Sequence, residues 1–407
     1  MSESFIFISN WTQGNGLSGG DKIWIELAKS WKSRFSVSVI GSQEAVNIAE
    51  REGLRGVEYI QSMPQIDGKN NLSVLSLIKN IFVRSFRAAS FVLRSKKLLN
   101  LNPQFIYSVS DFWPDSLAAF LLKKKYPQAK WIAGFYLFAP KPWAVDSPYK
   151  GINFIKGFFY FLIQWPIFCL VKKYADYVFV TSEPDVDKFI TPKRKRDKIV
   201  VVQGGVDMSE VRQFAMPDKD KAKRKYEACF MGRLHYQKGV LVLVDIWAVL
   251  VKTIPEAKLA IIGDGEMEKA LEEKIDKLNL KGNITLLGFM GGQKKFNVFN
   301  DSKVVVHPAI YDSGGMAAVE AMASGLPGVS FDLEALKTYY PKGMVKTPCF
   351  DVKKFAANII LLLQDSKLYE GIKKEAIEEA QKWDWEKRSD KVLGQLLQKS
   401  MKKELNA

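Results

Sequence analysis

The stretch "KVVVHPAIYDSGGMAAVEAMASGLPGVSFD", residues 303–332, decides the fold of this chain. It begins and ends with short apolar runs rich in β-branched residues. Between them, a Gly-Gly pair precedes a run of small apolar residues that is typical of a buried helix. A strand, a turn, a helix and a second strand in this order form a βαβ unit with parallel strands. Two carboxylates, Asp312 and Glu320, stand on either side of the Gly-Gly turn.

The same alternation of apolar runs and helical patterns continues outward in both directions. It predicts strands at 5–9, 36–40, 105–108, 131–135, 177–181 and 199–202, and within 227–234, 257–265, 283–289, 303–309 and 327–332. A chain of 407 residues is long enough for two cores. We therefore expect an α/β fold with two doubly wound Rossmann-like domains, 1–208 and 209–385, and a C-terminal helix, 386–407, that packs back on the first domain.

Composition argues against several classes of site. The three cysteines, Cys169, Cys229 and Cys349, stand far apart and in no C-x-x-C spacing, which disfavours a disulfide framework and a zinc site. With only two histidines besides, we expect no metal centre. The first residues lead into an apolar strand without the basic segment and cleavage site of a secretory signal, so the expected location is the cytosol.

The net charge of +16 is concentrated in the first half, where residues 1–208 hold 28 Lys and Arg against 17 Asp and Glu. Within 74–97 the basic residues fall on one side of a predicted helix and most apolar residues on the other. The five basic residues on that side are Lys79, Arg84, Arg87, Arg94 and Lys97. We predict a basic amphipathic helix that contacts an anionic membrane surface, with a solvated helix face as the alternative. No nucleic-acid-binding motif accompanies the charge, so no nucleic-acid partner is expected.

Residues 157–171, "GFFYFLIQWPIFCLV", form a second apolar segment. It is shorter than the roughly 20 residues that cross a bilayer, and it includes Gln164 and Pro166, so we do not expect a spanning helix. Two interpretations remain open. The segment is either a buried core helix or an interfacial segment that extends the membrane contact over 152–171.

A glycine-rich turn follows the first predicted strand and precedes a helix near Asp21. Its Gly19 and Gly20 would let the backbone approach an anion at the helix N-terminus. The pattern is not G-x-G-x-x-G, and a purely structural turn is an equal alternative. A nicotinamide-dependent dehydrogenase would also need an acid at the end of the second strand, where Glu44 lies a few residues out of place.

The second half contains two loops with groups that suit phosphates. The stretch "FMGRLHYQKG", residues 230–239, ends a strand near Gly232 and then places Arg233 and Lys238 on a glycine-bearing turn. A guanidinium and an ammonium there could hold two phosphates, although surface charges on a loop are the alternative. The next strand ends in "GDG", with Asp264 between two glycines.

The Gly-Gly turn of the opening stretch completes this set of groups. If Gly314, Gly315 and Met316 begin a helix, their unpaired amides point at an anion. Asp312 and Glu320 then border the same cavity, where carboxylates suit vicinal hydroxyls. A ligand with phosphates between two sugars would use all of these groups. We therefore predict that the second domain binds a nucleotide sugar.

These motifs resemble, in order and spacing, the retaining glycosyltransferases of family 4, the glycosyl transferases group 1. The residues that carry the resemblance are "GRLHYQKG", "IIGDGE", "LLGF", "HPAIYDSGGMAAVEAMASGLP" and the junction "VVQGGVD". The resemblance is dense over 227–332 and thinner through "SGGDKIWIELA" and "KKYADYVFVTSE". It implies the GT-B fold, in which two Rossmann-like domains face a central cleft.

The resemblance also implies roles for individual residues. Arg233 and Lys238 would hold the donor diphosphate and stabilise it as the leaving group. Glu320 resembles the second glutamate of the family's E-x7-E motif, which binds the donor ribose. Asp312 takes the place of the first glutamate, which contacts the transferred sugar, and its side chain is one methylene shorter.

Other donor contacts follow from the same resemblance. Backbone amides of the Gly-Gly turn would lie along the sugar and phosphates, and further loop residues would approach the diphosphate. These donor-binding residues are Gly19, Gly20, Gly232, Asp264, Ser313, Gly314, Gly315 and Met316.

The activity implied is transfer of a hexose-type sugar from a nucleotide-sugar donor to a glycan or lipid-linked acceptor, without cofactor or metal. From the basic helix and the neighbouring apolar segment, we expect it to take place at the inner face of the cell membrane, in cell-surface polysaccharide or glycolipid assembly. The chain departs from the family in lacking a first-domain histidine that many relatives carry, and we assign His235 and His307 structural roles. An inactive nucleotide-sugar-binding subunit and a GT-B-like epimerase are the alternatives.

Overall fold

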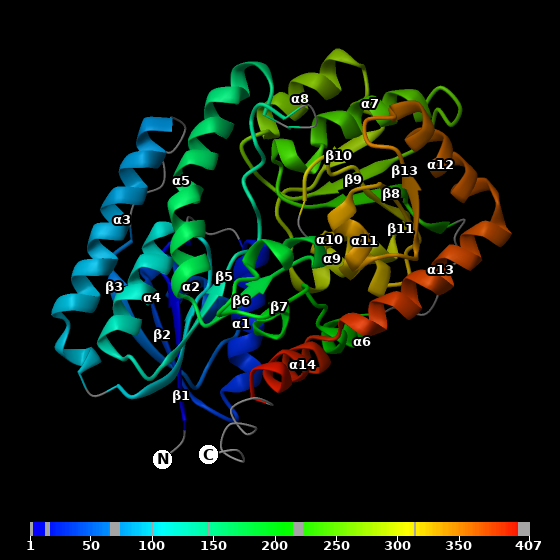
Figure 1. Ribbon diagram of the computed structural model, residues 1–407. Coiled ribbons are helices and arrows are strands. Elements are labelled where there is room, and N and C mark those ends of the chain that lie inside the picture. Colours follow the sequence, from blue (N-terminus) through cyan, green and yellow to red (C-terminus); the bar gives the residue numbers. More distant parts are fainter. Residues whose placement is uncertain are drawn as a thin grey trace. The chain divides into compact units, whose positions relative to one another are not determined.

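A computed structural model describes residues 3–12, 17–65, 74–99, 101–144, 147, 149–214, 223–312 and 315–397. The chain divides into two compact units, Met1–Gly204 with Glu386–Ala407 (unit 1) and Gly205–Trp385 (unit 2). Each unit contains one parallel sheet with helices on both faces (Figure 1), so the predicted α/β fold with two doubly wound domains is confirmed. The predicted boundary after residue 208 falls just inside unit 2.

Unit 1 has a seven-stranded parallel sheet in the order β3-β2-β1-β4-β5-β6-β7. Its strands are β1 (Ser4–Ser9), β2 (Ser36–Ser42), β3 (Glu58–Met63), β4 (Pro103–Ser108), β5 (Lys130–Gly134), β6 (Tyr177–Val180) and β7 (Ile199–Val201). Its helices are α1 (Gly19–Trp31), α2 (Gln43–Arg51), α3 (Val74–Arg94), α4 (Trp113–Lys125), α5 (Phe154–Tyr174) and α14 (Trp385–Leu397). The edge strand β3 was absent from the sequence-based prediction.

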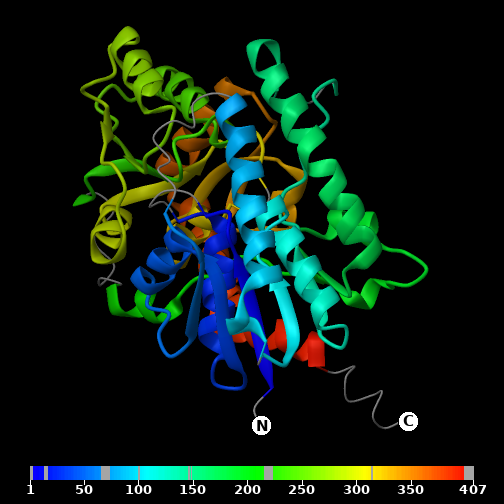
Figure 2. The same cartoon turned by 90° about the vertical axis from the view of Figure 1, so that its left-hand side faces the viewer.

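The alternation along β1 builds the two layers of unit 1, because successive side chains in a strand point to opposite faces of the sheet. Phe5 and Phe7 pack against the indoles of Trp24 and Trp31 from α1. Ile6, Ile8 and the neighbouring residues of that face join residues of α3, α4 and α5 in one apolar cluster. Figures 1 and 2 show these three helices side by side over that face of the sheet.

The C-terminal helix α14 packs on α1. The indole Nε1 of Trp31 donates to the backbone oxygen of Ser389, and the hydroxyl of Ser389 donates to that of Ser30 at 2.7 Å. Ser389 is fully buried by these contacts. The chain therefore returns to unit 1 after it has completed unit 2.

Helix α3 has exposed cations at Lys79, Arg87 and Arg94, as its sequence predicts, but it departs from the prediction at one cation and three apolar residues. The guanidinium of Arg84, expected on the exposed basic face, is buried and forms an ion pair of 2.6 Å with Glu44. Three apolar side chains expected on the inner face are instead about 70% exposed, namely Phe82, Phe86 and Leu93 (69%, 71% and 67%). Arg84 also donates to backbone carbonyls, so its charge and its N–H groups are satisfied inside the protein. Lys97 lies beyond α3, in the short turn Lys96–Leu98.

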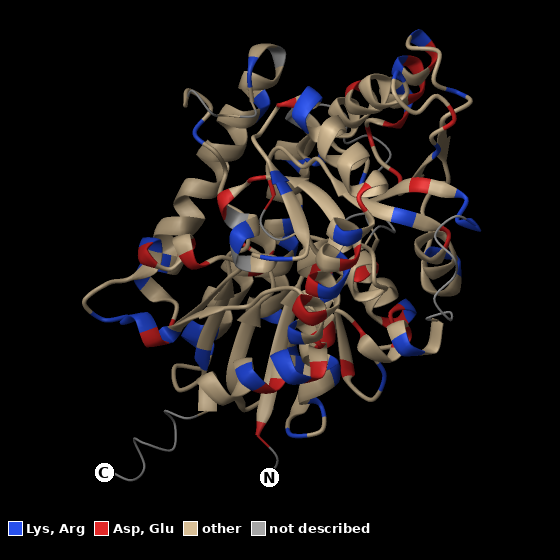
Figure 3. Cartoon of the chain, turned by 90° about the vertical axis from the view of Figure 1, so that its right-hand side faces the viewer, with Lys and Arg blue, Asp and Glu red and all other residues tan. Residues whose placement is uncertain are grey.

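Helix α5 extends the predicted apolar segment at both ends, to 21 residues. By length and composition alone it could cross a membrane, but only 22% of its most apolar window is buried, so it is not the buried core helix of the first interpretation. Its inner face packs on unit 1 through Ile167 and Val171, whereas Leu162 and Trp165 are about half exposed. Its charged residues lie near its two ends, and its middle is therefore tan in Figure 3.

Unit 2 has a six-stranded parallel sheet in the order β10-β9-β8-β11-β12-β13. Its strands are β8 (Tyr226–Met231), β9 (Leu259–Ile262), β10 (Ile284–Leu286), β11 (Ser302–His307), β12 (Gly328–Phe331) and β13 (Met344–Thr347). Its helices are α6 (Met208–Phe214), α7 (Val240–Leu250), α8 (Glu268–Lys277), α9 (Gly292–Asn300), α10 (Met316–Ala323), α11 (Glu334–Tyr339), α12 (Val352–Gln364) and α13 (Ser366–Ala380).

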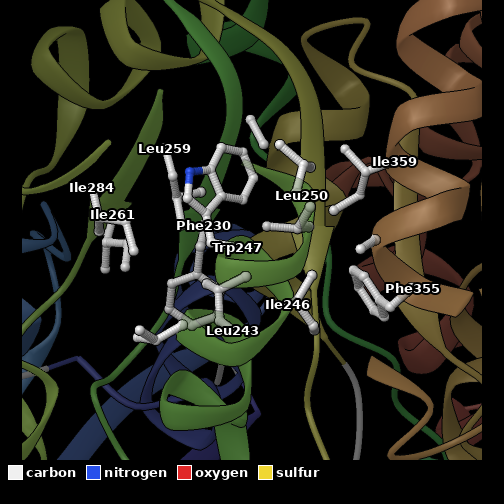
Figure 4. Packing of buried hydrophobic residues seen from close by; sticks show 14 of the residues in the cluster. Phe230, Leu243, Ile246, Trp247, Leu250, Leu259, Ile261, Ile284, Phe355 and Ile359 are labelled. Atoms are coloured by element: carbon white, nitrogen blue, oxygen red, sulfur yellow. The ribbon is translucent and has the colours of Figure 1, made fainter. Parts of the chain in front are cut away.

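One core of unit 2 centres on helix α7, which is apolar almost throughout. Trp247 and Leu250 of α7 meet Phe230 of β8, Leu259 of β9 and Phe355 of α12 in a single buried cluster (Figure 4). The opposite face of the sheet is covered by a second cluster that includes residues of α9, α10 and α13. Both faces of β8 and β11 are therefore buried, as the continuous apolar runs in the sequence predict.

We predict that Leu250→Ala lowers the free energy of unfolding of unit 2 by about 2–5 kcal/mol, because it opens a cavity in this cluster. The matched control is Leu361→Ala, since Leu361 on α12 is 49% exposed, and its effect should stay below about 1 kcal/mol. Urea unfolding followed by tryptophan fluorescence measures both. Equal effects of the two variants would contradict this description of the core.

Candidate functional site

The candidate site of unit 2 lies where the order of its strands reverses. Strands β8 and β11 are neighbours in the sheet, but their connections run outward in opposite directions. In open parallel sheets, ligands bind beyond the carboxyl ends of the strands at such a point. Arg233 and Lys238 follow β8, and Asp312 follows β11. The topology therefore places the predicted phosphate-binding and sugar-binding residues at one edge of the sheet.

The loops after β8, β9 and β11 approach one another closely through glycines. Gly239 has φ = 66°, and a Cβ on it would stand 2.0 Å from the backbone oxygen of Pro308. Gly263 has φ = 140°, and its Cβ would stand 1.9 Å from the oxygen of Gly232. No L-residue with a side chain fits either position, which explains the glycine-bearing turns in the sequence.

An ion pair and a hydrogen bond converge on Asp312. Its Oδ2 lies 2.6 Å from Nζ of Lys238 and 3.1 Å from Nε2 of His307. Burial by itself would raise the pKa of Asp312, but the Lys238 ammonium and the His307 hydrogen bond hold that pKa well below its ordinary value. Asp312 is therefore a carboxylate at neutral pH. His307 thus acts through Asp312, a contact that sequence analysis did not identify.

His307 supports Asp312 as a neutral ring. Burial lowers the pKa of His307, so at pH 7 its Nε2–H donates to Asp312. Its Nδ1 is buried and has no partner within the described part of the chain. His235, the other histidine, accepts a hydrogen bond from the backbone N–H of Gln237 and lies 3.4 Å from Glu266.

Arg233 and Asp264 lie at the same edge of the sheet but are not joined to this cluster. Both side chains are exposed, and neither has a protein partner among the residues that the structure describes. The backbone oxygen of Asp264 accepts from the N–H of Leu234, which ties the loop after β9 to the loop after β8. The Arg233 guanidinium is therefore available to a ligand.

Helix α10 begins at Met316, with Gly315 as its N-cap residue in a left-handed conformation (φ = 52°). Ser313 and Gly314, also predicted to bind the donor, lie outside the described residues. The buried hydroxyl of Tyr340 has no partner within the described ranges, and a Cβ on Gly315 would stand 2.5 Å from it. The start of α10 thus places the amides of a helix N-terminus close to a buried hydroxyl, and sequence analysis did not single out Tyr340.

Glu320 lies on α10, and its Oε2 accepts a hydrogen bond of 2.6 Å from Nζ of Lys295 on α9. Sequence analysis singled out Glu320 but not Lys295. The signal available was weak, because Lys295 stands in the ordinary-looking stretch "GQKKFNVFN", residues 292–300.

Comparison with known proteins agrees with this geometry. Residues 211–379 match the family model described as "Glycosyl transferases group 1". The matched residues lie within unit 2, and we call 211–379 the group 1 domain after the model that they match. An uncharacterized glycosyltransferase of Methanocaldococcus jannaschii is 31% identical over 154 residues, which cover 35% of this chain and 37% of that protein. The phosphatidyl-myo-inositol mannosyltransferase of Mycolicibacterium smegmatis is 28% identical over 190 residues, which cover 46% of this chain and 48% of that protein. This chain thus spans less than half the length of each of these two relatives.

Solved structures extend the likeness beyond the group 1 domain. The Anabaena protein HepE, in complex with UDP and glucose, matches 96% of this chain and 98% of its own, with a TM-score of 0.67 and 15% identity. At this identity the likeness establishes the fold. The expected GT-B fold is therefore confirmed.

Two of the predicted donor-binding residues lie in unit 1, outside the group 1 domain. Gly19 and Gly20 are the first residues of α1, which is capped by Ser18, and Ser18 and Asp21 hydrogen-bond reciprocally across this turn. A Cβ on Gly20 would lie 3.5 Å from the ring of Tyr136. The turn is therefore an ordered helix start, and the predicted contact of Gly19 and Gly20 with a diphosphate stays a prediction.

A buried polar network occupies the strand reversal of unit 1, between β1 and β4. Arg84 donates to the backbone oxygens of Asn10 and Thr12 as well as to Glu44. The carboxylate of Asp115 accepts from the N–H of Asn10 and the hydroxyl of Ser110. Burial raises the pKa of Asp115 to about 7, although the hydrogen bonds from Ser110 and Asn10 lower it in part.

Asp115 should make stability depend on pH. Because its pKa rises from 3.8 to about 7 in the folded state, the folded chain binds more protons than the unfolded chain between these values. The free energy of unfolding should therefore fall as the pH rises from about 4 to about 7. Asp115→Asn should flatten this slope by up to about 1.4 kcal/mol per pH unit.

Urea unfolding at several pH values measures the effect. Asp390→Asn is the control, because Asp390 on α14 is exposed, and it should leave the slope unchanged. An identical slope in the wild type and Asp115→Asn would show that Asp115 is ionised in the folded protein throughout this range.

Proposed function

We propose that the protein is a retaining glycosyltransferase of the family 4 type. It moves a hexose-type sugar from a nucleoside diphosphate sugar to a glycan or lipid-linked acceptor, in cell-surface polysaccharide or glycolipid assembly. One observation carries the proposal. Lys238, an exposed Arg233 and the start of α10 follow the two strands at which the sheet of the group 1 domain reverses its order.

Each of these groups can donate hydrogen bonds to the oxygens of a diphosphate. Lys238 has three N–H donors, of which one goes to Asp312, so the others can reach phosphate oxygens. Arg233 can bind two oxygens at once. The amides of Gly315 and Met316 lie at the positive end of the α10 dipole. In this assignment Asp312 accepts from a hydroxyl of the transferred sugar, and Glu320 accepts from the ribose.

The proposed chemistry proceeds on one face of the sugar. The bond from the anomeric carbon to the β-phosphate oxygen breaks, and the acceptor oxygen bonds to the same carbon from the same side. The acceptor proton passes to the departing diphosphate. Arg233, Lys238 and the α10 amides stabilise the charge that develops on that diphosphate, which is the usual source of most rate enhancement in such sites.

The named relatives support the choice of donor and acceptor class. One is described as a phosphatidyl-myo-inositol mannosyltransferase, and HepE was solved with UDP and glucose. We propose that cationic side chains and helix amides take the place of a metal here. Activity should then persist in EDTA.

A panel of UDP-, GDP- and ADP-sugars tests donor binding, with saturation-transfer NMR as the measurement. We expect one nucleotide class to bind the wild type, and Arg233→Ala and Glu320→Ala to weaken that binding by about tenfold or more, because each removes a charged hydrogen-bond partner. Lys281→Ala is the control, since Lys281 is an exposed surface residue of the same unit.

Product analysis separates the alternatives. Transfer with the donor's anomeric configuration kept supports the proposal, whereas inversion would contradict the retaining mechanism. A donor that binds but is neither transferred nor hydrolysed would indicate a binding subunit. Epimerisation of the donor's sugar in the absence of an acceptor would indicate an epimerase.

We further propose that unit 1 rests on the inner face of the cell membrane through α3 and α5. Exposed aromatic side chains, Phe82 and Phe86 on α3 and Trp165 on α5, provide apolar contact. The exposed cations of the α3 segment provide attraction to anionic lipids, namely Lys79, Arg87, Arg94, Lys96 and Lys97. Each cation contributes about 1 kcal/mol near such a surface. Gln164 of α5 bonds to Asp111 and to the backbone of Leu137 and Ala139, which favours a helix that lies on the membrane over one that crosses it.

Cosedimentation with vesicles tests this contact. The wild type should bind vesicles of anionic lipid at low salt and be released at high salt, and the double variant Phe82→Ser, Phe86→Ser should bind at least tenfold more weakly. The control is Phe289→Ser, because Phe289 is 57% exposed on unit 2. Equal binding to neutral and anionic vesicles would refute the electrostatic part.

A further inference from the structure

Lys295 lies on the buried face of α9, where its neighbours are apolar. Its neighbours Phe296 and Phe299 are 2% and 0% exposed and belong to the buried cluster on this face of the sheet. Lys295 itself is only 8% exposed. A lysine is almost never buried to this extent unless its charge is paired, so its presence on the inner face requires an explanation.

The partner of Lys295 is the carboxylate of Glu320. Nζ lies 2.6 Å from Oε2, and the side chains of the two residues are 10% and 19% exposed. The ammonium also lies 4.9 Å from the ring centroid of Phe296. The pair is thus held between α9 and α10, with the carboxylate as its more exposed member.

The second carboxylate oxygen of Glu320 can still accept hydrogen bonds. Among the described residues no donor reaches its Oε1, and the side chain keeps part of its surface open. A carboxylate fixed through one oxygen cannot rotate freely. Its open oxygen and the second lone pair of Oε2 can then accept from two neighbouring hydroxyls at once.

We propose that Lys295 is a positioning residue for nucleotide recognition. It holds Glu320 in the orientation in which the carboxylate accepts from both the 2′- and the 3′-hydroxyl of the donor's ribose. This inference rests on the proposed function, because Glu320 is taken as the ribose ligand. Its consequence is selectivity for ribonucleotides over 2′-deoxyribonucleotides, and that selectivity depends on a residue outside the donor-contacting set.

The test compares ribo and 2′-deoxyribo ligands by isothermal titration calorimetry. UDP, GDP and ADP are screened on the wild type, and the tightest binder is then compared with its 2′-deoxy form. We expect the wild type to prefer the ribo form by at least about tenfold, the worth of one charged hydrogen bond. Lys295→Met should weaken ribo binding about tenfold and reduce the preference to less than about threefold. Lys295→Arg should restore most of the preference.

The chain offers a matched control in the same unit. Lys303 and Glu227 form an ion pair of 2.9 Å with similar exposure, 19% and 17%, on β11 and β8. Lys303→Met should leave the ribo preference at its wild-type value, even if it lowers the melting temperature. On a Glu320→Gln background, Lys295→Met should change ribo binding less than twofold, because the residue through which it acts is already altered.

The outcomes are distinct. If the wild type binds but Lys295→Met keeps the full ribo preference, Lys295 is only a structural ion-pair partner and this inference is overturned alone. If none of the three diphosphates binds the wild type, the proposed function is overturned and this inference with it. Circular dichroism verifies folding, and Lys295→Gln serves as the second neutral variant if Lys295→Met does not fold.

Discussion

The contact between Lys238 and Asp312 is the interaction on which the rest of the candidate site depends. It joins the loop after β8 to the loop after β11, across the point where the sheet of unit 2 reverses its order. The contact forms because Gly239 lets its loop approach the backbone of Pro308, and because His307 holds the other side of Asp312. Removing the Lys238 charge would leave the buried Asp312 carboxylate without its cation, which costs more than the pair contributes. The pair therefore fixes the position of the cation that we assign to the donor diphosphate.

Much of this arrangement could be predicted because it is local in sequence. A strand followed by a glycine turn and a helix has a strong pattern, and Arg233, Lys238, Asp312 and Glu320 each stand within such a unit. The edge strands β3 and β13 were missed for a physical reason. An edge strand has a neighbour on one side only and tolerates polar residues such as Gln61 and Lys346, so its apolar pattern is weak.

What could not be predicted depends on partners far away in the sequence. Arg84 was taken for a surface cation because its periodicity fits the basic face of α3, and only the fold shows the carbonyls of Asn10 and Thr12 around its guanidinium. Lys295 and Tyr340 were missed for the same reason. Each carries a polar group into a buried position, and each becomes informative only when the neighbouring helix is known. Hydrophobic periodicity predicts which face of a helix is buried, but not which polar side chains are buried with it.

The return of α14 to unit 1 has a consequence for synthesis on the ribosome. Unit 2 is complete in sequence by Trp385, whereas unit 1 still lacks the helix that bonds to Ser30 and Trp31. Unit 2 can therefore fold while unit 1 still exposes part of α1, including apolar surface around Trp31. During this interval the nascent chain resembles a protein truncated at its C-terminus, and it is then that a chaperone would find its binding surface. Synthesis of α14, rather than emergence of the first sheet, would complete the first unit.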